Sequence, residues 1–188
     1  STVDAHRAVP LPCHGYDRDT APLLSELADE YTLFTEAYSA SSHTREAVPS
    51  ILTGYCPTES TGPDCRLTAP TFASKFDSEV VRTAGFHSNP YVSRAYGFGA
   101  GFDEFDDDLY LGRHRLVALA QRAWDKIRNR HYARAEEINK RALEWIDGRD
   151  GDSFVLWNHY MDVHGPYEPI ESYRKQFHDG PVSDREAQ

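Results

Sequence analysis

The stretch that decides the fold is SASSHTREAVPSILTG, residues 39–54. A short polar loop leads into a segment whose apolar residues fall at 47, 48, 51 and 52, which is the spacing of one helix face. Glu46 falls in the first turn, where the helix dipole favours a carboxylate. Gly54 stands where a glycine commonly ends a helix. We therefore predict a polar loop feeding an amphipathic helix.

The hydroxyl residues at the start of this helix allow two interpretations. Ser41, Ser42 and Thr44 all belong to residue types that cap helix N-termini. A helix N-terminus also presents unpaired N–H groups and the positive end of the dipole, and so it binds anions. Thr44 is then either a cap only, which is the commoner case, or a hydroxyl held where a phosphate or sulfate group binds.

Length and composition indicate one globular domain of a larger protein. The chain has 188 residues, of which 39% are hydrophobic and 12% aromatic, enough for a buried core. No apolar run approaches the roughly 18 residues of a membrane span, and no signal peptide opens the chain. Ser1 to Asp4 resemble the end of a strand, so we expect a fragment. The expected compartment is the cytoplasm.

The charge balance disfavours a nucleic-acid partner. The net charge is −10, whereas phosphate contacts need an excess of Lys and Arg. The 20 basic residues comprise 16 Arg and 4 Lys. Many carboxylates with few lysines suit a halophilic protein, because salt screens the repulsion between like charges. An ordinary acidic protein remains an equal alternative.

The three cysteines, Cys13, Cys56 and Cys65, do not suggest a metal site or a disulfide framework. They contain no CxxC pair and are widely spaced. We expect free or buried thiols.

The order of elements predicts an α/β fold with a mostly parallel sheet. Residues 80–86 and 153–160 are apolar runs typical of buried strands, and 32–38 alternate as a short strand would. Helices are expected from residues 19–22 onward, near 70–76 and within 113–147. We interpret the Asp and Glu residues within 97–108 as a solvent-exposed surface stretch, in a loop that Phe102 and Phe105 anchor. The expected architecture is a three-layer sandwich with helices on both faces.

Polar residues of catalytic type follow each predicted strand. Asp4 follows the first strand, Asn89 lies in the turn after 80–86, and His159, Asp162 and His164 cluster at the end of the last strand. Ligands of open α/β sheets bind beside these carboxyl ends. Local turn and capping roles would also explain Asp4 and Asn89.

Four stretches together resemble the N-terminal half of the sulfatase branch of the alkaline phosphatase superfamily. The opening around Asp4 with the Thr20-Ala-Pro22 helix start is similar to the family's metal-binding opening. Residues 37–54 resemble the nucleophile helix with its "LLTG" ending. Residues 101–105, GFDEF, are similar to a recurring "GFDxF" loop, and residues 160–167, YMDVHGPY, to the "DPHxPY" stretch.

The chain also departs from the family pattern. Sulfatases of the formylglycine type carry Cys-x-Pro-x-Arg, and counting back from Gly54 puts Thr44 at the Cys position and Val48 at the Arg position. A threonine there resembles phosphotransferase and phosphodiesterase branches, such as lipoteichoic acid synthases and phosphoethanolamine transferases. Asn89 stands near the place of an absent Lys-x-His, and the family's later Asp-His-Gly metal ligands are not in the sequence.

The resemblance implies an alkaline phosphatase-like catalytic domain whose N-terminal part spans residues 1–188. It implies a divalent metal, Ca²⁺, Mn²⁺, Mg²⁺ or Zn²⁺, bound partly by Asp4. Thr44 becomes the nucleophile with Arg45 beside it, and His164, His159 and Asn89 become substrate-binding residues. The implied partner is a small-molecule or glycan ester of sulfate or phosphate. Ser42 is the rival nucleophile, and an anion-binding homologue without turnover or a purely structural fragment are the other possibilities.

Overall fold

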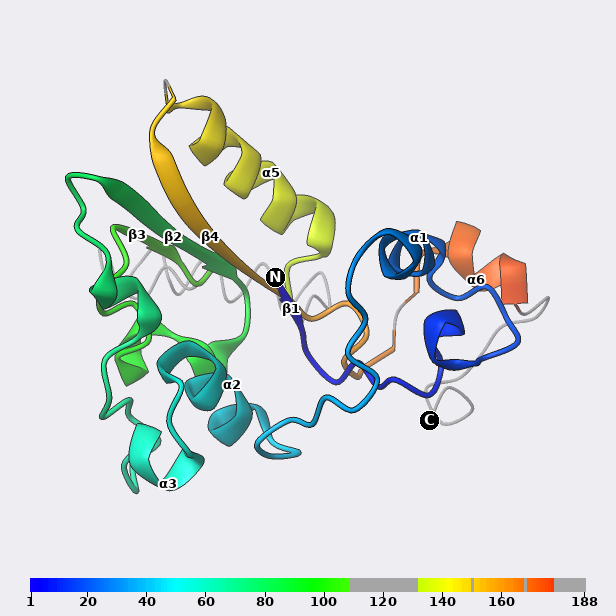
Figure 1. Cartoon of the computed structure of the whole chain (residues 1–188), viewed down its shortest axis with the longest axis horizontal. Coiled ribbons are helices and arrows are strands. Elements are labelled where there is room, and N and C mark those ends of the chain that lie inside the picture. The colour runs from blue at the N-terminus through cyan, green and yellow to red at the C-terminus, as the bar shows by residue number, and fades with distance from the viewer. Residues whose placement is uncertain (109–131, 150, 168, 178–188) are drawn as a thin grey trace, which may run out of the picture. The chain divides into compact units, whose positions relative to one another are not determined.

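The computed structural model describes residues 1–108, 132–149, 151–167 and 169–177 (Figure 1). The chain forms two compact units. One unit joins Ser1–Asp4 to Ala40–Gln188, and the other is Ala5–Ser39. The smaller unit contains a short 3₁₀ helix, Pro12–His14, and α1, Pro22–Glu30.

The larger unit is built on a four-stranded sheet in which every pairing is parallel. The spatial order is β1-β4-β2-β3. The register sets His159 of β4 between Thr2 of β1 and His87 of β2. The carboxyl ends of three strands therefore meet at one edge of the sheet. The strands are β1 Thr2–Val3, β2 Val81–His87, β3 Glu104–Asp106 and β4 Ser153–Tyr160.

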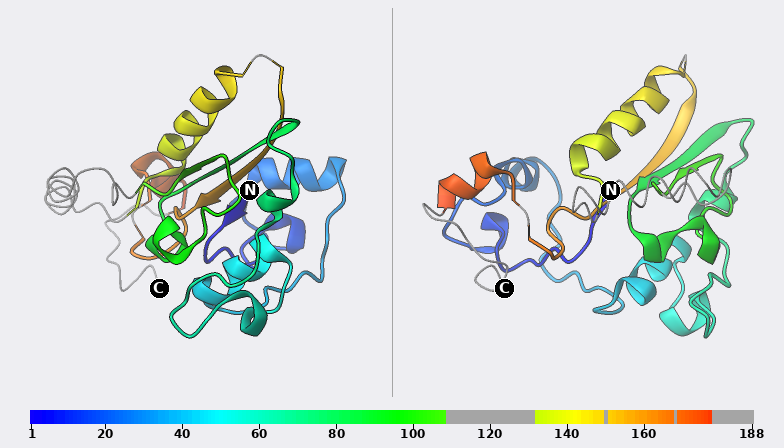
Figure 2. Two further views of the ribbon diagram at one scale, coloured as in Figure 1. Left: turned by 90° about the vertical axis from the view of Figure 1, so that its left-hand side faces the viewer. Right: turned by 180° about the vertical axis from the view of Figure 1, so that it is seen from behind.

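Helices complete the larger unit, and Figure 2 shows α5 beside the sheet from two further sides. Three short 3₁₀ helices connect the longer elements: Phe72–Lys75, Pro90–Val92 and Arg94–Tyr96. The α-helices are α2 Thr44–Thr53, α3 Pro57–Ser60, α5 Ala135–Asp147 and α6 Glu171–Phe177.

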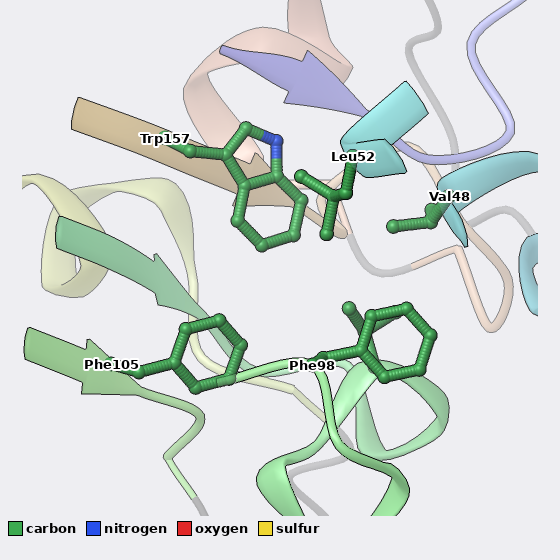
Figure 3. Close-up of a cluster of buried hydrophobic side chains, with 6 residues drawn as sticks. Val48, Leu52, Phe98, Phe105 and Trp157 are labelled. Atoms are coloured by element: carbon green, nitrogen blue, oxygen red, sulfur yellow. The ribbon is translucent and has the colours of Figure 1, made fainter. Parts of the chain in front are cut away.

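One face of the sheet packs against α2 (Figure 3). Trp157 and Phe105 project from β4 and β3 and stack with their ring planes 15° apart. Gly85 of β2 leaves room for them, since a Cβ there would lie 2.9 Å from a Phe105 ring carbon. Val48 and Leu52 of α2 close this core together with Val92 and Phe98.

The opposite face packs against α5. Ala84 and Phe86 alternate with Gly85 along β2 and so face the other side. They meet Ile138 and Ala142 of the helix, both buried. Helices on the two faces of a parallel sheet give the predicted α/β sandwich.

The core position of Leu52 makes a direct test of this packing. We expect Leu52→Ala to lower the free energy of unfolding by about 2 to 5 kcal/mol, because the side chain is fully buried and its loss leaves a cavity. The neighbouring Ile51 is 53% exposed, so Ile51→Ala should change stability by no more than about 0.5 kcal/mol. Urea unfolding followed by circular dichroism measures both values. Equal losses in the two variants would contradict this packing.

Most of the predicted elements are confirmed. The strands expected at 80–86 and 153–160 are β2 and β4, each within one residue. The segment 70–76 contains the 3₁₀ helix Phe72–Lys75. Gly54 ends α2 with a left-handed φ of 76°. Of the helical region predicted at 113–147, α5 covers the last part, and residues 113–131 lie outside the described residues.

The strand predicted at residues 32–38 is wrong. This segment contains neither strand nor helix. Its alternating side chains Phe34 and Tyr38 are 74% and 88% exposed. The pattern alone does not make a strand where no neighbouring strand pairs with it.

The solvated interpretation of the acidic loop is wrong for residues 106–108, whereas Asp103 and Glu104 are exposed. Asp107 is 1% exposed, accepts the backbone N–H of Arg94 at 3.0 Å and lies 3.4 Å from its Nε. Asp106 and Asp108 both pair with Arg141 of α5, at 2.8 and 3.2 Å. The ion pairs with Arg141 connect the edge strand β3 to α5. Buried or half-buried carboxylates need such charged partners.

The expectation for the cysteines was confirmed. Cys13, Cys56 and Cys65 are free thiols. Within the described ranges, no helix has the length and apolarity that crossing a bilayer requires.

Candidate active site

The candidate site forms where the ends of β1, β2 and β4 meet the N-terminus of α2. Asp4 follows β1 directly, and its backbone N–H donates to the carbonyl of Tyr160 at 2.9 Å. Asn89 follows β2 and caps the 3₁₀ helix after it. Thr44 is the first residue of α2. The sheet edge thus gathers residues that are 40 and 85 positions apart in sequence.

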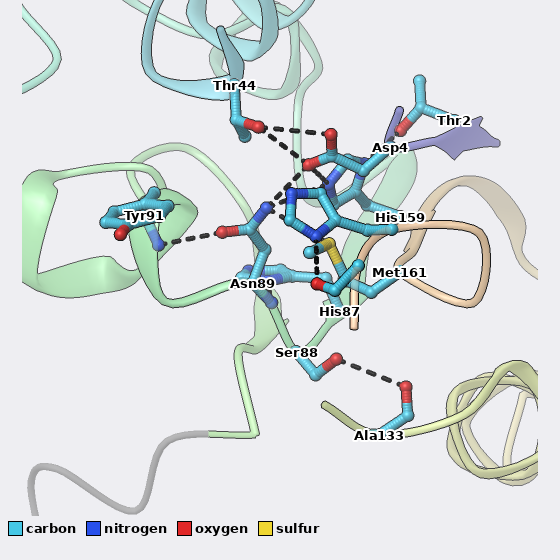
Figure 4. Close-up of polar contacts among 12 residues, drawn as sticks. Thr2, Asp4, Thr44, His87, Ser88, Asn89, Tyr91, Ala133, His159 and Met161 are labelled. Atoms are coloured by element: carbon cyan, nitrogen blue, oxygen red, sulfur yellow. Dashed lines mark hydrogen bonds and ion pairs between the residues drawn. The ribbon is translucent and has the colours of Figure 1, made fainter. Parts of the chain in front are cut away.

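Thr44 points at the carboxylate of Asp4 (Figure 4). Its hydroxyl donates to Asp4 Oδ2 at 2.9 Å and lies 3.2 Å from Oδ1. The residue before the helix is His43, and it provides no side-chain cap. Thr44 is therefore not the N-cap of α2, and its hydroxyl serves Asp4 instead. The first N–H groups of the helix are left to other acceptors.

Two buried side chains hold the same carboxylate from behind. Asn89 Nδ2 donates to Asp4 Oδ2 at 2.9 Å, and His159 Nε2 lies 3.3 Å from that atom. Asn89 and His159 are 1% and 2% exposed. Because a carboxylate only accepts, His159 carries its proton on Nε2. Its Nδ1, 2.8 Å from the Thr2 hydroxyl, then accepts.

A further layer fixes the Asn89 amide. Its Oδ1 accepts the backbone N–H of Tyr91 at 2.9 Å, and the backbone N–H of Asn89 donates to His87 Nδ1 at 3.1 Å. Its Nδ2 also lies 3.2 Å from the sulfur of Met161. With Oδ1 engaged, Nδ2 has to face Asp4.

The carboxylate of Asp4 is stabilised in its charged form. Burial alone would raise its pKa, but hydrogen bonds from His159 and Thr44 outweigh burial. The nearby imidazoles of His159 and His164 act in the same direction through electrostatic interaction, and the net pKa of Asp4 is lowered. Asp4 is thus a charged acceptor at neutral pH.

His87 is a buried neutral histidine beneath the site. Burial, followed by charge effects from His159, Arg141 and Arg94, lowers its pKa to about 3. Its ring packs against Phe105 at 5.0 Å. Within the part of the chain that the structure describes, its Nε2 has no hydrogen-bond partner.

This burial predicts an acid-sensitive fold. Between pH 6.5 and about 3 the unfolded chain binds a proton at His87 that the folded chain does not. The free energy of unfolding should therefore fall as the pH falls through this window, by up to about 1.4 kcal/mol per pH unit. We expect His87→Gln to remove this part of the slope, whereas His14→Gln in the smaller unit should keep it. Urea unfolding from pH 7 to 4 measures the slopes. Equal slopes in wild type and His87→Gln would overturn the assignment.

The other predicted residues lie around this centre. Arg45 follows Thr44, is exposed, and stacks on Tyr91 with Cζ 4.2 Å from the ring centroid. His164 is half-buried, and its Nδ1 lies 2.7 Å from the carbonyl of Gly165. It is close enough to lower the pKa of Asp4. Asp162 instead accepts the N–H of Ala135 at the start of α5.

Sequence reasoning missed several members of the site. Thr2, His87, Tyr91 and Tyr132 were not singled out. For Thr2 and His87 the available signal was the register of parallel strands, which places them beside His159. No sequence signal pointed to Tyr132, because it reaches the site from a distant segment.

The donors at the centre fit part of a metal site. Asp4 and Thr44 present oxygen atoms 2.9 Å apart, and oxygen donors suit hard divalent cations. Among the described residues, no three His, Cys, Asp or Glu side chains form a group that could hold a metal. The fit is therefore that of two ligands of a larger set.

The fold and the site define an α/β protein with a hydroxyl and a carboxylate paired at the sheet's carboxyl edge. The model of the sulfatase family matches residues 2–188. The chain belongs to the sulfatase family. Among curated proteins, no match to the chain was found.

Proposed function

We propose that the protein is a metal-dependent hydrolase of sulfate esters that works through a covalent intermediate on Thr44. One observation carries the proposal: the Thr44 hydroxyl lies at the N-terminus of α2 with its proton directed to Asp4 at 2.9 Å. A hydroxyl so placed is oriented for attack on an anionic ester. Membership of the sulfatase family supports the reaction class.

The chain's own residues account for the first half of the reaction. The Thr44 oxygen forms a bond to sulfur while the bond from sulfur to the leaving alcohol breaks. The Thr44 proton passes to Asp4, which already accepts it. The leaving alcohol takes up a proton from solvent. Water then attacks the sulfur of the intermediate, and Asp4 returns its proton to the Thr44 oxygen as the bond from that oxygen to sulfur breaks. Sulfate leaves and the two water protons pass to solvent, which balances the hydrolysis.

The surrounding groups stabilise charge during this step. Asn89 and His159 hold Asp4 in place rather than facing solvent, so we assign them positioning roles. The helix N–H groups, Arg45 and His164 supply positive potential for the anion. Asp4 and Thr44 would hold the divalent cation, which supplies Lewis-acid polarisation of the ester when bound. Oxygen donors suit Ca²⁺, Mg²⁺ and Mn²⁺ better than Zn²⁺.

The threonine itself favours a second candidate function. Thr44 occupies the position of the formylglycine cysteine, so the protein would instead act on phosphate esters as a phosphodiesterase or phosphotransferase of the same superfamily. Either a small molecule or a glycan ester fits this chemistry. A homologue that binds an anionic ligand without turnover would use the same arrangement of residues. It would differ from the enzyme only in not catalysing the reaction.

Trapping the intermediate tests the proposal. The purified protein is mixed with an aryl sulfate, an aryl phosphate monoester or an aryl phosphodiester, each with added Mn²⁺ or Ca²⁺, and quenched in acid. We expect a sulfuryl or phosphoryl adduct on the peptide that contains Thr44. Fragmentation separates Thr44 from Ser42, the rival nucleophile. An adduct on Ser42, or turnover that a chelator leaves unchanged, would contradict the proposal. Preference for the phosphodiester would favour the second candidate.

A further inference from the structure

Two tyrosines lie against Arg45 and His164, two side chains of the site. Tyr91 stands two residues after Asn89, and the Arg45 guanidinium lies over its ring at 4.2 Å. The backbone N–H of Tyr91 holds Asn89 Oδ1, which turns Nδ2 to Asp4. One residue therefore contacts both the cation beside Thr44 and the amide behind Asp4.

The second pair is formed by Tyr132 and His164. Their rings meet edge to face, with centroids 5.8 Å apart and planes at 74°. Burial raises the pKa of Tyr132, and the nearby charges of Tyr91 and Asp4 raise it further. The charge of Asp4 therefore acts on Tyr132, whose ring lies against His164.

The stacking contact restricts the Arg45 side chain, which is otherwise exposed. An exposed arginine samples many rotamers, and fixing it on an anion costs conformational entropy. A guanidinium that already lies on an aromatic ring has lost part of that freedom. An anion bound at Thr44 then meets a cation whose direction is set in advance.

We propose that Tyr91 and Tyr132 are positioning residues that hold Arg45 and His164 beside the Asp4–Thr44 pair for binding the sulfate or phosphate group. This inference rests on the proposed function. It adds that the affinity for the anionic group depends on two aromatic rings that need not touch the reacting atoms.

Binding of inorganic sulfate and phosphate tests this without any turnover. Isothermal titration calorimetry compares wild type with Tyr91→Leu, Tyr91→Phe and Tyr55→Leu. We expect Tyr91→Leu to weaken anion binding by about two- to five-fold, and Tyr91→Phe to recover most of the affinity because the ring remains. Tyr55 is 49% exposed against 44% for Tyr91, so Tyr55→Leu is a matched control that should bind like wild type.

Arginine variants connect the effect to the stacked pair. Arg45→Lys keeps the charge but loses the planar stack, and it should weaken binding about as much as Tyr91→Leu. The double variant, Arg45→Lys with Tyr91→Leu, should bind the anion about as well as Arg45→Lys alone, because both changes remove the same stacking contact. Arg45→Lys also keeps the test independent of whether Tyr91→Leu folds.

The same comparison applies to Tyr132. Tyr132→Leu should weaken anion binding by a similar factor, whereas Tyr132→Phe should not. Unchanged anion affinity in both leucine variants, with folding confirmed by thermal unfolding, would overturn the inference while leaving the proposed function intact. If wild type binds neither anion, the inference fails as well. Absence of turnover in addition to absence of binding would remove the proposed function.

Discussion

Replacing Thr44 with alanine is expected to reduce ester turnover by about 10³-fold or more, because the variant lacks the attacking oxygen. The backbone at the start of α2 should stay in place, since Thr44 does not cap the helix. Asp4 would keep its contacts with Asn89 and His159. The loss should therefore appear in kcat rather than in folding. Steady-state kinetics with aryl sulfate and aryl phosphate esters in Mn²⁺ or Ca²⁺ measure it.

Two further variants separate the nucleophile from other roles of a hydroxyl. Thr44→Ser keeps an oxygen at the same position and should retain measurable turnover. Ser42 is exposed and lies 3.2 Å from His43 Nδ1, not beside Asp4, so Ser42→Ala should leave turnover near wild type. Undiminished turnover in Thr44→Ala would end the hypothesis and make Ser42 the candidate.

The sequence was sufficient for the parts of the fold that local patterns specify. The apolar runs of β2 and β4 are typical of strands buried on both faces, and both were predicted. The helix from Thr44 to Gly54 followed from its apolar spacing and its terminal glycine. Asp4 and the polar residues after the later strands were expected near one edge because parallel strands bring their carboxyl ends together, whereas Thr44 was placed with Asp4 by the family resemblance.

The errors concern properties that depend on distant partners. Asp107 is buried beside Arg94, and Asp106 pairs with Arg141, which α5 brings to the edge strand. The sequence alone does not show such pairings. For the same reason it did not show that Asn89 and His159 lie beneath Asp4. Their substrate-binding role stays a prediction, and their burial supports a positioning role instead.

Asp4→Asn is the second change for which we expect a large effect. Three donors converge on this carboxylate: the Thr44 hydroxyl, Asn89 Nδ2 and His159 Nε2. An amide has only one acceptor oxygen, and its NH₂ group would face another donor. The variant also loses the group that accepts the Thr44 proton. We expect turnover to fall by about 10²-fold or more.

Anion binding distinguishes this loss from a general collapse of the site. Asp4 is negatively charged, so its removal should leave the metal-free affinity for inorganic sulfate unchanged or raise it, whereas Arg45→Lys should lower it. Asp64→Asn is the matched control. Asp64 is an exposed carboxylate outside the site, and its Oδ2 lies 3.3 Å from Nε of Arg66. Wild-type turnover in Asp4→Asn would show that Asp4 does not take part in the reaction. Weaker sulfate binding in Asp4→Asn would show instead that the carboxylate mainly maintains the shape of the site, because removing a negative charge cannot itself weaken the binding of an anion.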